Sequence, residues 1–222
     1  VGPNNVWWDR YKPYADYCRR ISWMNAVGKH VCDTAILATA TRLPWRAARV
    51  LFEHQRDFNY LDGDTLLSSA QVTVEGIQVG DMKYRALIID GADTLEPGTL
   101  DALKPMIDAG KIAAYKDDTE GIPITAVDGD ALLERLSTIT PPDMMLKPGH
   151  PDIRFRHVVI DGCHFYFVTN EGNKMVDVEL QVAVHGKRAW WNPETACVMA
   201  EEPSERLRIP PYTSRVLFIK ES

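Results

Sequence analysis

Large aromatic side chains are concentrated in one short stretch near the start of the chain, where Trp7, Trp8, Tyr11 and Tyr14 follow one another closely. Tryptophan and tyrosine combine a broad apolar face with a polar group, so a cluster of them either fills a core or stacks on a flat, partly apolar ligand such as a sugar ring. Both roles require a second surface. We expect that surface to come from another part of a larger protein.

Carboxylates are the other residues with a chemistry to consider, because glycoside hydrolysis needs two of them about 5 to 10 Å apart across a cleft. Asp62, Asp64, Asp90, Asp93 and Glu96 follow expected strands, and open α/β sheets bind ligands at the strand ends. Acids beside glycine and proline also form turns and helix caps. None has an apolar or aromatic setting that marks it as catalytic, so no catalytic residue is predicted.

Motifs for nucleotide binding, nucleophilic catalysis and metal binding are missing from the sequence. The turn after the first expected strand, residues 38–44, lacks the Gly-x-Gly-x-x-Gly pattern, and no Gly-x-Ser-x-Gly or Gly-x-Cys-x-Gly elbow occurs. The cysteines and histidines lack metal-ligand spacing, and His157 with His164 reads as a cross-strand pair. We therefore predict no metal site and no cofactor in these residues.

The composition is that of an ordinary globular protein. The chain has 222 residues, 45% of them hydrophobic, with a net charge of -6. An acidic protein without a basic stripe is not expected to bind nucleic acid, and no apolar run reaches the roughly 20 residues of a membrane span. The compartment cannot be read from a leader peptide.

The first two thirds of the chain alternate between helical and strand patterns. Tyr14, Tyr17, Ile21 and Met24 recur at helical spacing within the expected helix 9–27, and continuous apolar runs predict buried strands. Further helices are expected from residue 44, around residues 66–67, and over 97–109 and 129–136; strands are expected at 31–37, 58–61, 84–90 and 112–115. This alternation predicts a parallel sheet with helices on both faces.

A proline-rich passage, 141–151, marks a change to period-two alternation. Residues 156–160 and 164–168 form a hairpin around Asp161-Gly162, and residues 176–184 alternate strictly. Together with short strands further on, they predict an antiparallel β-sandwich of about seventy residues. Trp190 and Trp191 precede a turn at Asn192-Pro193, where they either offer a stacking platform or pack the sandwich against its neighbour.

Three separated passages of the sequence match one known pattern. The first runs from Asn4-Asn5-Val6-Trp7-Trp8 through Gly28-Lys29-His30. The second runs from Tyr84-Arg85-Ala86-Leu87 to Asp108-Ala109-Gly110. The third combines Val168-Thr169-Asn170 with Trp191-Asn192-Pro193-Glu194-Thr195. In these passages the chain resembles the large bacterial α-L-rhamnosidases of glycoside hydrolase family 106 and their relatives. The third is similar to their valine-asparagine and tryptophan-aspartate-proline-x-threonine-glycine signature, with Asn192 for the usual aspartate and Ala196 for the usual glycine.

The resemblance implies a fold that is α/β plus all-β. One helix of a (β/α)8 barrel, residues 1–28, would precede a degenerate glutamine-amidotransferase-like open parallel-sheet domain, 29–140, a linker, 141–151, and an antiparallel β-sandwich, 152–222. Such enzymes hydrolyse terminal α-L-rhamnosyl groups by inversion, with acid and base on the barrel and, in some members, a calcium ion at the sugar.

No catalytic residue is carried over, because nearly all of the barrel lies outside these residues. Asn4, Asn5, Trp7 and Trp8 are the only candidates for substrate contact, at the barrel's mouth. If they belong there, their rings should be covered by another polypeptide or be exposed.

The resulting expectation is the C-terminal accessory portion of a glycoside hydrolase that acts on α-L-rhamnosyl or related glycosides of plant or bacterial polysaccharides. Its partners would be the catalytic barrel and the carbohydrate substrate, and the resemblance suggests a periplasmic or extracellular location. A non-catalytic carbohydrate-binding or oligomerisation module is the alternative. An independent amidotransferase-like enzyme is disfavoured by the missing cysteine elbow.

Overall fold

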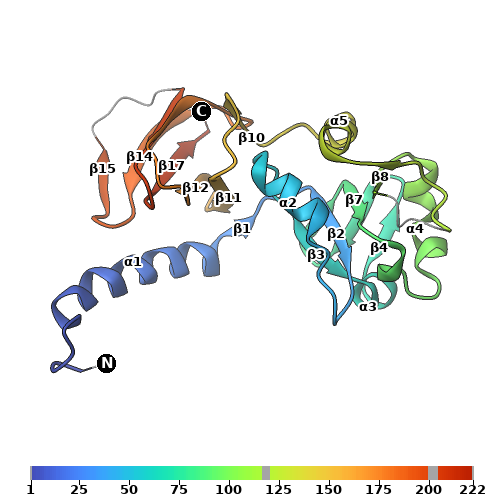
Figure 1. Ribbon diagram of the computed structural model, residues 1–222, viewed down its shortest axis with the longest axis horizontal. Helices are drawn as coiled ribbons and strands as arrows, with labels where there is room; N and C mark the ends of the chain where they lie inside the picture. The colour runs from blue at the N-terminus through green and yellow to red at the C-terminus, as the bar shows by residue number, and fades with distance from the viewer. Residues whose placement is uncertain (1, 117–120, 200–204, 222) are drawn as a thin grey trace. The chain divides into compact units, whose positions relative to one another are not determined.

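A computed structural model describes residues 2–116, 121–199 and 205–221 (Figure 1). The chain forms two compact units. Unit 1 comprises Val1–Val31 and Met144–Ser222, and unit 2 comprises Cys32–Asp143. Within the described ranges, no helix has both the length and the apolar character needed to cross a membrane.

Unit 2 contains a five-stranded parallel sheet in the order β3-β2-β7-β8-β9. The strands are β2 (Thr34–Ala38), β3 (Asn59–Asp62), β7 (Ala86–Ile89), β8 (Ile112–Tyr115) and β9 (Ala126–Val127). Every residue of β2, β7 and β8 is buried, as the continuous apolar runs predicted. The strand order reverses between β2 and β7, and ligands of such sheets bind outside the carboxyl ends at that point.

Helices cover both faces of this sheet, and strict alternation along the strands divides the contacts. On one face lie α2 (Arg46–Glu53) and α5 (Gly129–Ile139) with Ile36 and Ile88. On the other lie α3 (Gly63–Ser68) and α4 (Thr99–Asp108) with Leu37 and Leu87. A 3-10 turn spans Ala92–Thr94, and a small antiparallel sheet is built from β4 (Gln71–Thr73), β5 (Gly76–Val79) and β6 (Met82–Tyr84).

Unit 1 is a β-sandwich of a six-stranded and a three-stranded antiparallel sheet. The larger sheet has the order β1 (Lys29–His30), β11 (Ile153–Ile160), β12 (Cys163–Asn170), β17 (Ser214–Lys220), β14 (Lys187–Asn192) and β15 (Cys197–Met199). The smaller sheet has the order β10 (Met144–Lys147), β13 (Val176–Val182) and β16 (Arg206–Ile209). Their facing side chains form one core that includes Tyr166 and Trp190.

The helix α1 (Trp8–Val27) adds a third layer, on the outer face of the six-stranded sheet. Met24 packs there with Val158, Phe165 and Val216. Of the expected apolar stripe, Met24 is buried, Tyr17 and Ile21 are partly buried, and Tyr14 is exposed.

The mixed α/β and antiparallel architecture agrees with the expected fold class. The arrangement of segments differs from the expected domain limits, because residues 1–31 group with the sandwich. The expected linker 141–151 contains β10, which pairs with β13 and contributes Met144 and Leu146 to the sandwich core. The proline-rich composition of this passage predicted a linker. It forms a strand because it pairs with β13, which lies more than thirty residues further along the chain.

Candidate binding site on the helix-covered face of the sandwich

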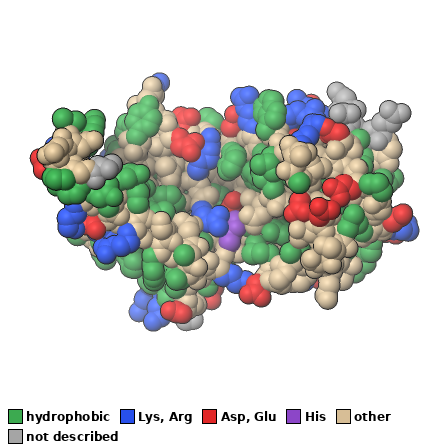
Figure 2. Space-filling view, turned by 90° about the horizontal axis from the view of Figure 1, so that it is seen from below, with side chains coloured by type: hydrophobic (Ala, Val, Ile, Leu, Met, Phe, Trp, Pro, Cys, Tyr) green, Lys and Arg blue, Asp and Glu red, His purple; other side chains and the backbone are tan. Residues whose placement is uncertain are grey.

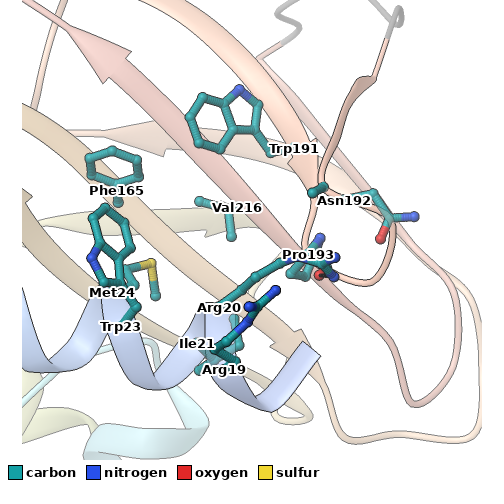
Figure 3. A pocket seen from close by; sticks show the side chains of 11 residues that line it. Arg19, Arg20, Ile21, Trp23, Met24, Phe165, Trp191, Asn192, Pro193 and Val216 are labelled. Atoms are coloured by element: carbon teal, nitrogen blue, oxygen red, sulfur yellow. Dashed lines mark hydrogen bonds between the residues drawn. The ribbon is translucent and has the colours of Figure 1, made fainter. Parts of the chain in front are cut away.

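A pocket of about 440 Å³ lies within unit 1, between α1 and the outer face of the six-stranded sheet (Figure 3). The helix supplies one wall through Arg20, Trp23 and Met24. The sheet supplies Phe165 and Trp191. The remaining lining residues are Arg19, Ile21, Asn192, Pro193, Ala196 and Val216.

The turn that follows β14 closes one end of this pocket, and its shape is fixed by hydrogen bonds. The Asn192 side-chain oxygen accepts from the Glu194 backbone N–H at 2.9 Å, which is an Asx turn. Arg20 of α1 donates to the carbonyls of Pro193 at 3.0 Å and Glu194 at 2.7 Å. Ala196 ends the turn with φ of 59°, a conformation that favours glycine.

Aromatic packing holds the floor of the pocket. Trp191 stacks on Phe218 at 5.2 Å and meets Phe165 edge-on at 5.8 Å. Trp23 is 55% exposed at the rim. Among the described residues, those lining this pocket include no carboxylate. The arrangement can accept an apolar or aromatic group, but it lacks the acid and base for glycoside hydrolysis.

The two neighbouring tryptophans of β14, Trp190 and Trp191, face opposite sides of the sheet and have different roles. Trp190 lies in the sandwich core and is 6% exposed, whereas Trp191 faces the pocket. This split follows from strand alternation, which sends neighbouring side chains to opposite faces.

The sequence-predicted contact residues lie outside this pocket, before and in the first turn of α1. Trp7 is 70% and Trp8 is 41% exposed, which is one of the two states expected of these rings. Trp8 stacks on Tyr11 at 5.7 Å, and the Asn5 side chain accepts a hydrogen bond from the Trp7 backbone N–H at 2.9 Å. Asn4 is exposed. Their role in substrate contact stays a prediction.

Two of the acids at the strand ends of unit 2 form ion pairs. Asp90 is fully buried and accepts from Arg46 Nε and from the Ala47 backbone N–H, each at 2.9 Å. Asp93 pairs with Arg42. A carboxylate of the chain itself therefore occupies the N-terminus of α2, where a bound anion would otherwise lie.

Asp62 is the side-chain cap of α3. Its carboxylate accepts from the Thr65 backbone N–H and hydroxyl, both at 2.8 Å, and these bonds lower the pKa of Asp62. Asp64 is exposed in the first turn of the same helix. Glu96 lies so close to Gly63 that a Cβ at that glycine would meet its carboxyl carbon at 2.8 Å. Capping and ion pairing thus account for Asp62, Asp90 and Asp93.

The histidine pair lies on the inner face of the sandwich. His157 Nε2 and His164 Nδ1 share a hydrogen bond of 2.8 Å, and His157 stacks on Tyr166 at 3.9 Å. The two histidines are diagonal neighbours across β11 and β12, because His157 pairs directly with Tyr166. In the described part of the chain, no three histidine, cysteine, aspartate or glutamate side chains are grouped as a metal site would require.

Sequence reasoning missed most of the apolar pocket. Arg20 and Trp23 lie in the first passage of the family resemblance, but neither they nor Phe165 were candidates for a site. Their shared role depends on the packing of α1 against strands that follow more than a hundred residues later. The available signal was the turn after Trp191, which was recognised as a candidate platform.

Comparison with solved structures places this architecture among those of glycoside hydrolases. No family model and no curated protein sequence matches the chain. A rhamnosidase from Novosphingobium sp. PP1Y matches with a TM-score of 0.73 and 14% identity, over 99% of this chain and 25% of that one. A β-galactosidase from Bacillus circulans sp. alkalophilus matches with a TM-score of 0.57 and 9% identity, over 91% and 43%.

A catalytic mutant of Gan42B, a GH42 β-galactosidase from G. stearothermophilus, matches with a TM-score of 0.56 and 10% identity, over 91% of this chain and 42% of that one. The chain therefore shares its fold with part of each of these enzymes. It spans a quarter of the rhamnosidase and less than half of either β-galactosidase.

Proposed function

We propose that this chain is a non-catalytic accessory part of a larger glycoside hydrolase that acts on α-L-rhamnosyl or related glycosides. In this proposal, the acid and base belong to a catalytic barrel, and unit 1 attaches the accessory part to it. A calcium ion, where one is used, would belong to the barrel.

The observation that carries the proposal is the extent of the fold match. Nearly the whole chain, both units included, corresponds to one quarter of a rhamnosidase. At 14% identity the likeness concerns the fold alone, so the rhamnosyl specificity rests on the name of that enzyme and on the resemblance of the motifs.

The exposed start of α1 supports an attachment role. Val6 is 90%, Trp7 70% and Tyr14 66% exposed, and Trp8 and Tyr11 complete this N-terminal aromatic surface. Figure 2 shows hydrophobic side chains exposed on one face of the protein, interspersed with charged ones. Exposed apolar patches of this kind mark interaction sites on soluble proteins.

The second support is that carboxylates of unit 2 are already engaged in hydrogen bonds to the backbone. Asp90 and Asp62 are bound to main-chain N–H groups, and the apolar pocket between α1 and the six-stranded sheet has no carboxylate among its described lining residues. A glycosidase acid or base needs a free carboxyl group that faces a cleft.

The test is hydrolysis by residues 1–222 alone. With 4-nitrophenyl α-L-rhamnopyranoside and 4-nitrophenyl β-D-galactopyranoside as substrates, we expect no release of nitrophenol above a protein-free blank. Turnover that disappears when a single carboxylate of this chain is replaced by its amide would contradict the proposal.

A further inference from the structure

A second pocket of unit 1, separate from the apolar one, combines aromatic rings with hydroxyl groups. It has a volume of about 320 Å³ and lies between the first half of α1 and the ends of β12 and β17. We call it the tyrosine pocket, and the lining residues that matter here are Tyr14, Tyr17, Tyr212, Thr169, Thr213 and Glu194.

Two of the three tyrosines of α1, Tyr14 and Tyr17, line this pocket. Tyr17 shares a hydrogen bond of 3.0 Å with the Ser214 hydroxyl of β17. The Cys18 side chain, one turn further along the helix, raises the pKa of Tyr14. A ring that is held by its hydroxyl group, as Tyr17 is, loses little freedom when a ligand binds.

Tyr212 is presented to solvent by a strained but well-anchored loop. It is 73% exposed, and its φ of 54° lies in the left-handed region, which costs a residue with a side chain about 1 to 2 kcal/mol. Fully buried Asn170 holds this loop, because its Nδ2 donates to the carbonyls of Ile209 at 3.2 Å and Pro210 at 3.1 Å. The Thr213 hydroxyl also donates to Pro210, at 2.9 Å.

The left-handed conformation of Tyr212 does not serve core packing, because its side chain is mostly exposed to solvent. Backbone strain that the surroundings enforce is often found where a side chain must be positioned for binding. The loop thus fixes an exposed ring at a pocket that Tyr14 and the hydrogen-bonded Tyr17 also line.

From this geometry we propose that the tyrosine pocket binds a single neutral pyranose ring, with the apolar face of the sugar against Tyr14 and Tyr212. The Glu194 carboxylate and the Thr169 and Thr213 hydroxyls supply partners for the sugar hydroxyls. Aromatic faces combined with a few convergent polar groups are the usual composition of a ligand site of this size.

An organic cation is the competing ligand, because aromatic rings beside a carboxylate also bind ammonium groups. The hydroxyls of Thr169, Thr213 and Ser214 favour the sugar. Although the Thr213 hydroxyl donates to Pro210 and the Ser214 hydroxyl is bonded to Tyr17, both oxygens keep a lone pair that can accept from a sugar hydroxyl, whereas a quaternary ammonium group has no hydrogen to donate.

The inference concerns binding by residues 1–222 and does not depend on the proposed accessory role. It adds a saccharide site within unit 1. Hydrolysis by residues 1–222 would contradict the accessory role and leave the sugar-binding proposal standing. A titration without binding would contradict the sugar-binding proposal and leave the accessory role standing.

The test is a titration of the intact chain with methyl α-L-rhamnopyranoside, methyl β-D-galactopyranoside and methyl β-D-glucopyranoside, followed by ligand-observed NMR. A ligand of about twelve non-hydrogen atoms is expected to bind with a millimolar Kd. Tyr212→Ala and Tyr14→Ala should each weaken binding about tenfold, since each removes a stacking face. Tyr212→Phe keeps the ring and should change Kd by less than about twofold.

Trp45→Ala is the matched control, because Trp45 is a similarly exposed ring, at 66%, that belongs to unit 2. It should leave the sugar Kd unchanged, and circular dichroism should show all variants folded. Tetramethylammonium chloride is titrated in parallel, with Glu194→Gln as the variant.

Saturable binding of at least one sugar that depends on both tyrosines is the expected result. No saturation by any of the three sugars at 50 mM, on the order of ten times the expected Kd, would overturn the proposal. So would binding that Tyr212→Ala leaves intact, or saturable binding of tetramethylammonium alone.

Discussion

Replacing the buried Asn170 by alanine should destabilise unit 1 more than replacing Asn192, the asparagine of a partly exposed turn, by alanine. Asn170 is fully buried, and its Nδ2 donates to Lys174 O at 2.8 Å as well as to the two carbonyls of the Tyr212 loop. Its Oδ1 accepts from the Gly172 backbone N–H at 2.9 Å. One side chain therefore fastens two loops, 171–175 and 210–213.

The magnitude follows from counting bonds. Two N–H hydrogens serve three carbonyls, so the side chain makes about three full hydrogen bonds, each contributing roughly 1 kcal/mol net, and alanine leaves their partners unpaired in the interior. We expect Asn170→Ala to lower the free energy of unfolding of unit 1 by about 3 to 4 kcal/mol. Asn192→Ala is the matched control. It removes one bond of a partly exposed Asx turn and should cost about 1 kcal/mol.

The assay is urea denaturation followed by tryptophan fluorescence. Five of the six tryptophans, all except Trp45, belong to unit 1, so the signal reports mainly on that unit. Equal losses for Asn170→Ala and Asn192→Ala would refute the assignment of Asn170 as the anchor of both loops.

Three further changes test other parts of the structure. Asp90→Ala should destabilise unit 2 by about 3 kcal/mol, because Arg46 and the Ala47 backbone N–H both lose their buried acceptor. Asp93→Ala removes an exposed ion pair and should cost at most about 1 kcal/mol. Hydrogen exchange resolved by segment distinguishes the two variants, and equal protection of unit 2 in both would count against the buried ion pair. Ala196→Gly should stabilise unit 1 by about 1 kcal/mol by relieving the positive φ, and a lower urea midpoint would argue that the turn is unstrained. Asp62→Ala should cost about 1 kcal/mol at pH 7, measured by denaturation. Since the folded pKa of Asp62 is lowered, its contribution is present above the unfolded value of about 3.9 and is lost as the pH falls through the folded pKa. The difference from the parent should therefore shrink as the pH falls below about 3.9, and a constant difference would exclude the charged cap.

Local patterns predicted most of the individual elements. The buried runs at Ala35–Leu37 and Ala86–Ile89 identified a parallel sheet, and alternation from Val176 to Val182 identified a sandwich strand, because each pattern is set by neighbours within one element. The assembly of unit 1 was not predictable. Its β10 and α1 join strands that follow much later in the chain, and no local period encodes such pairings.

The sites show the same division between local and long-range information. The turn at Asn192 and the residue Asn170 were recognised as parts of a motif, but only the structure shows that the first closes the apolar pocket and the second anchors the Tyr212 loop. The tyrosine pocket depends on a bond between Tyr17 and Ser214, which are 197 positions apart. The spacing of residue types along the sequence does not predict a contact between residues so far apart.

The most direct test of the accessory role is to express the complete reading frame that encodes this chain and compare it with residues 1–222. The account predicts that the complete product hydrolyses 4-nitrophenyl α-L-rhamnopyranoside or a related glycoside and that residues 1–222 do not. It also predicts that replacing Trp7 and Trp8 by alanine lowers the thermal stability of the complete product more than Trp45→Ala does. A reading frame that encodes no further domain, or equal hydrolysis by residues 1–222 alone, would contradict it.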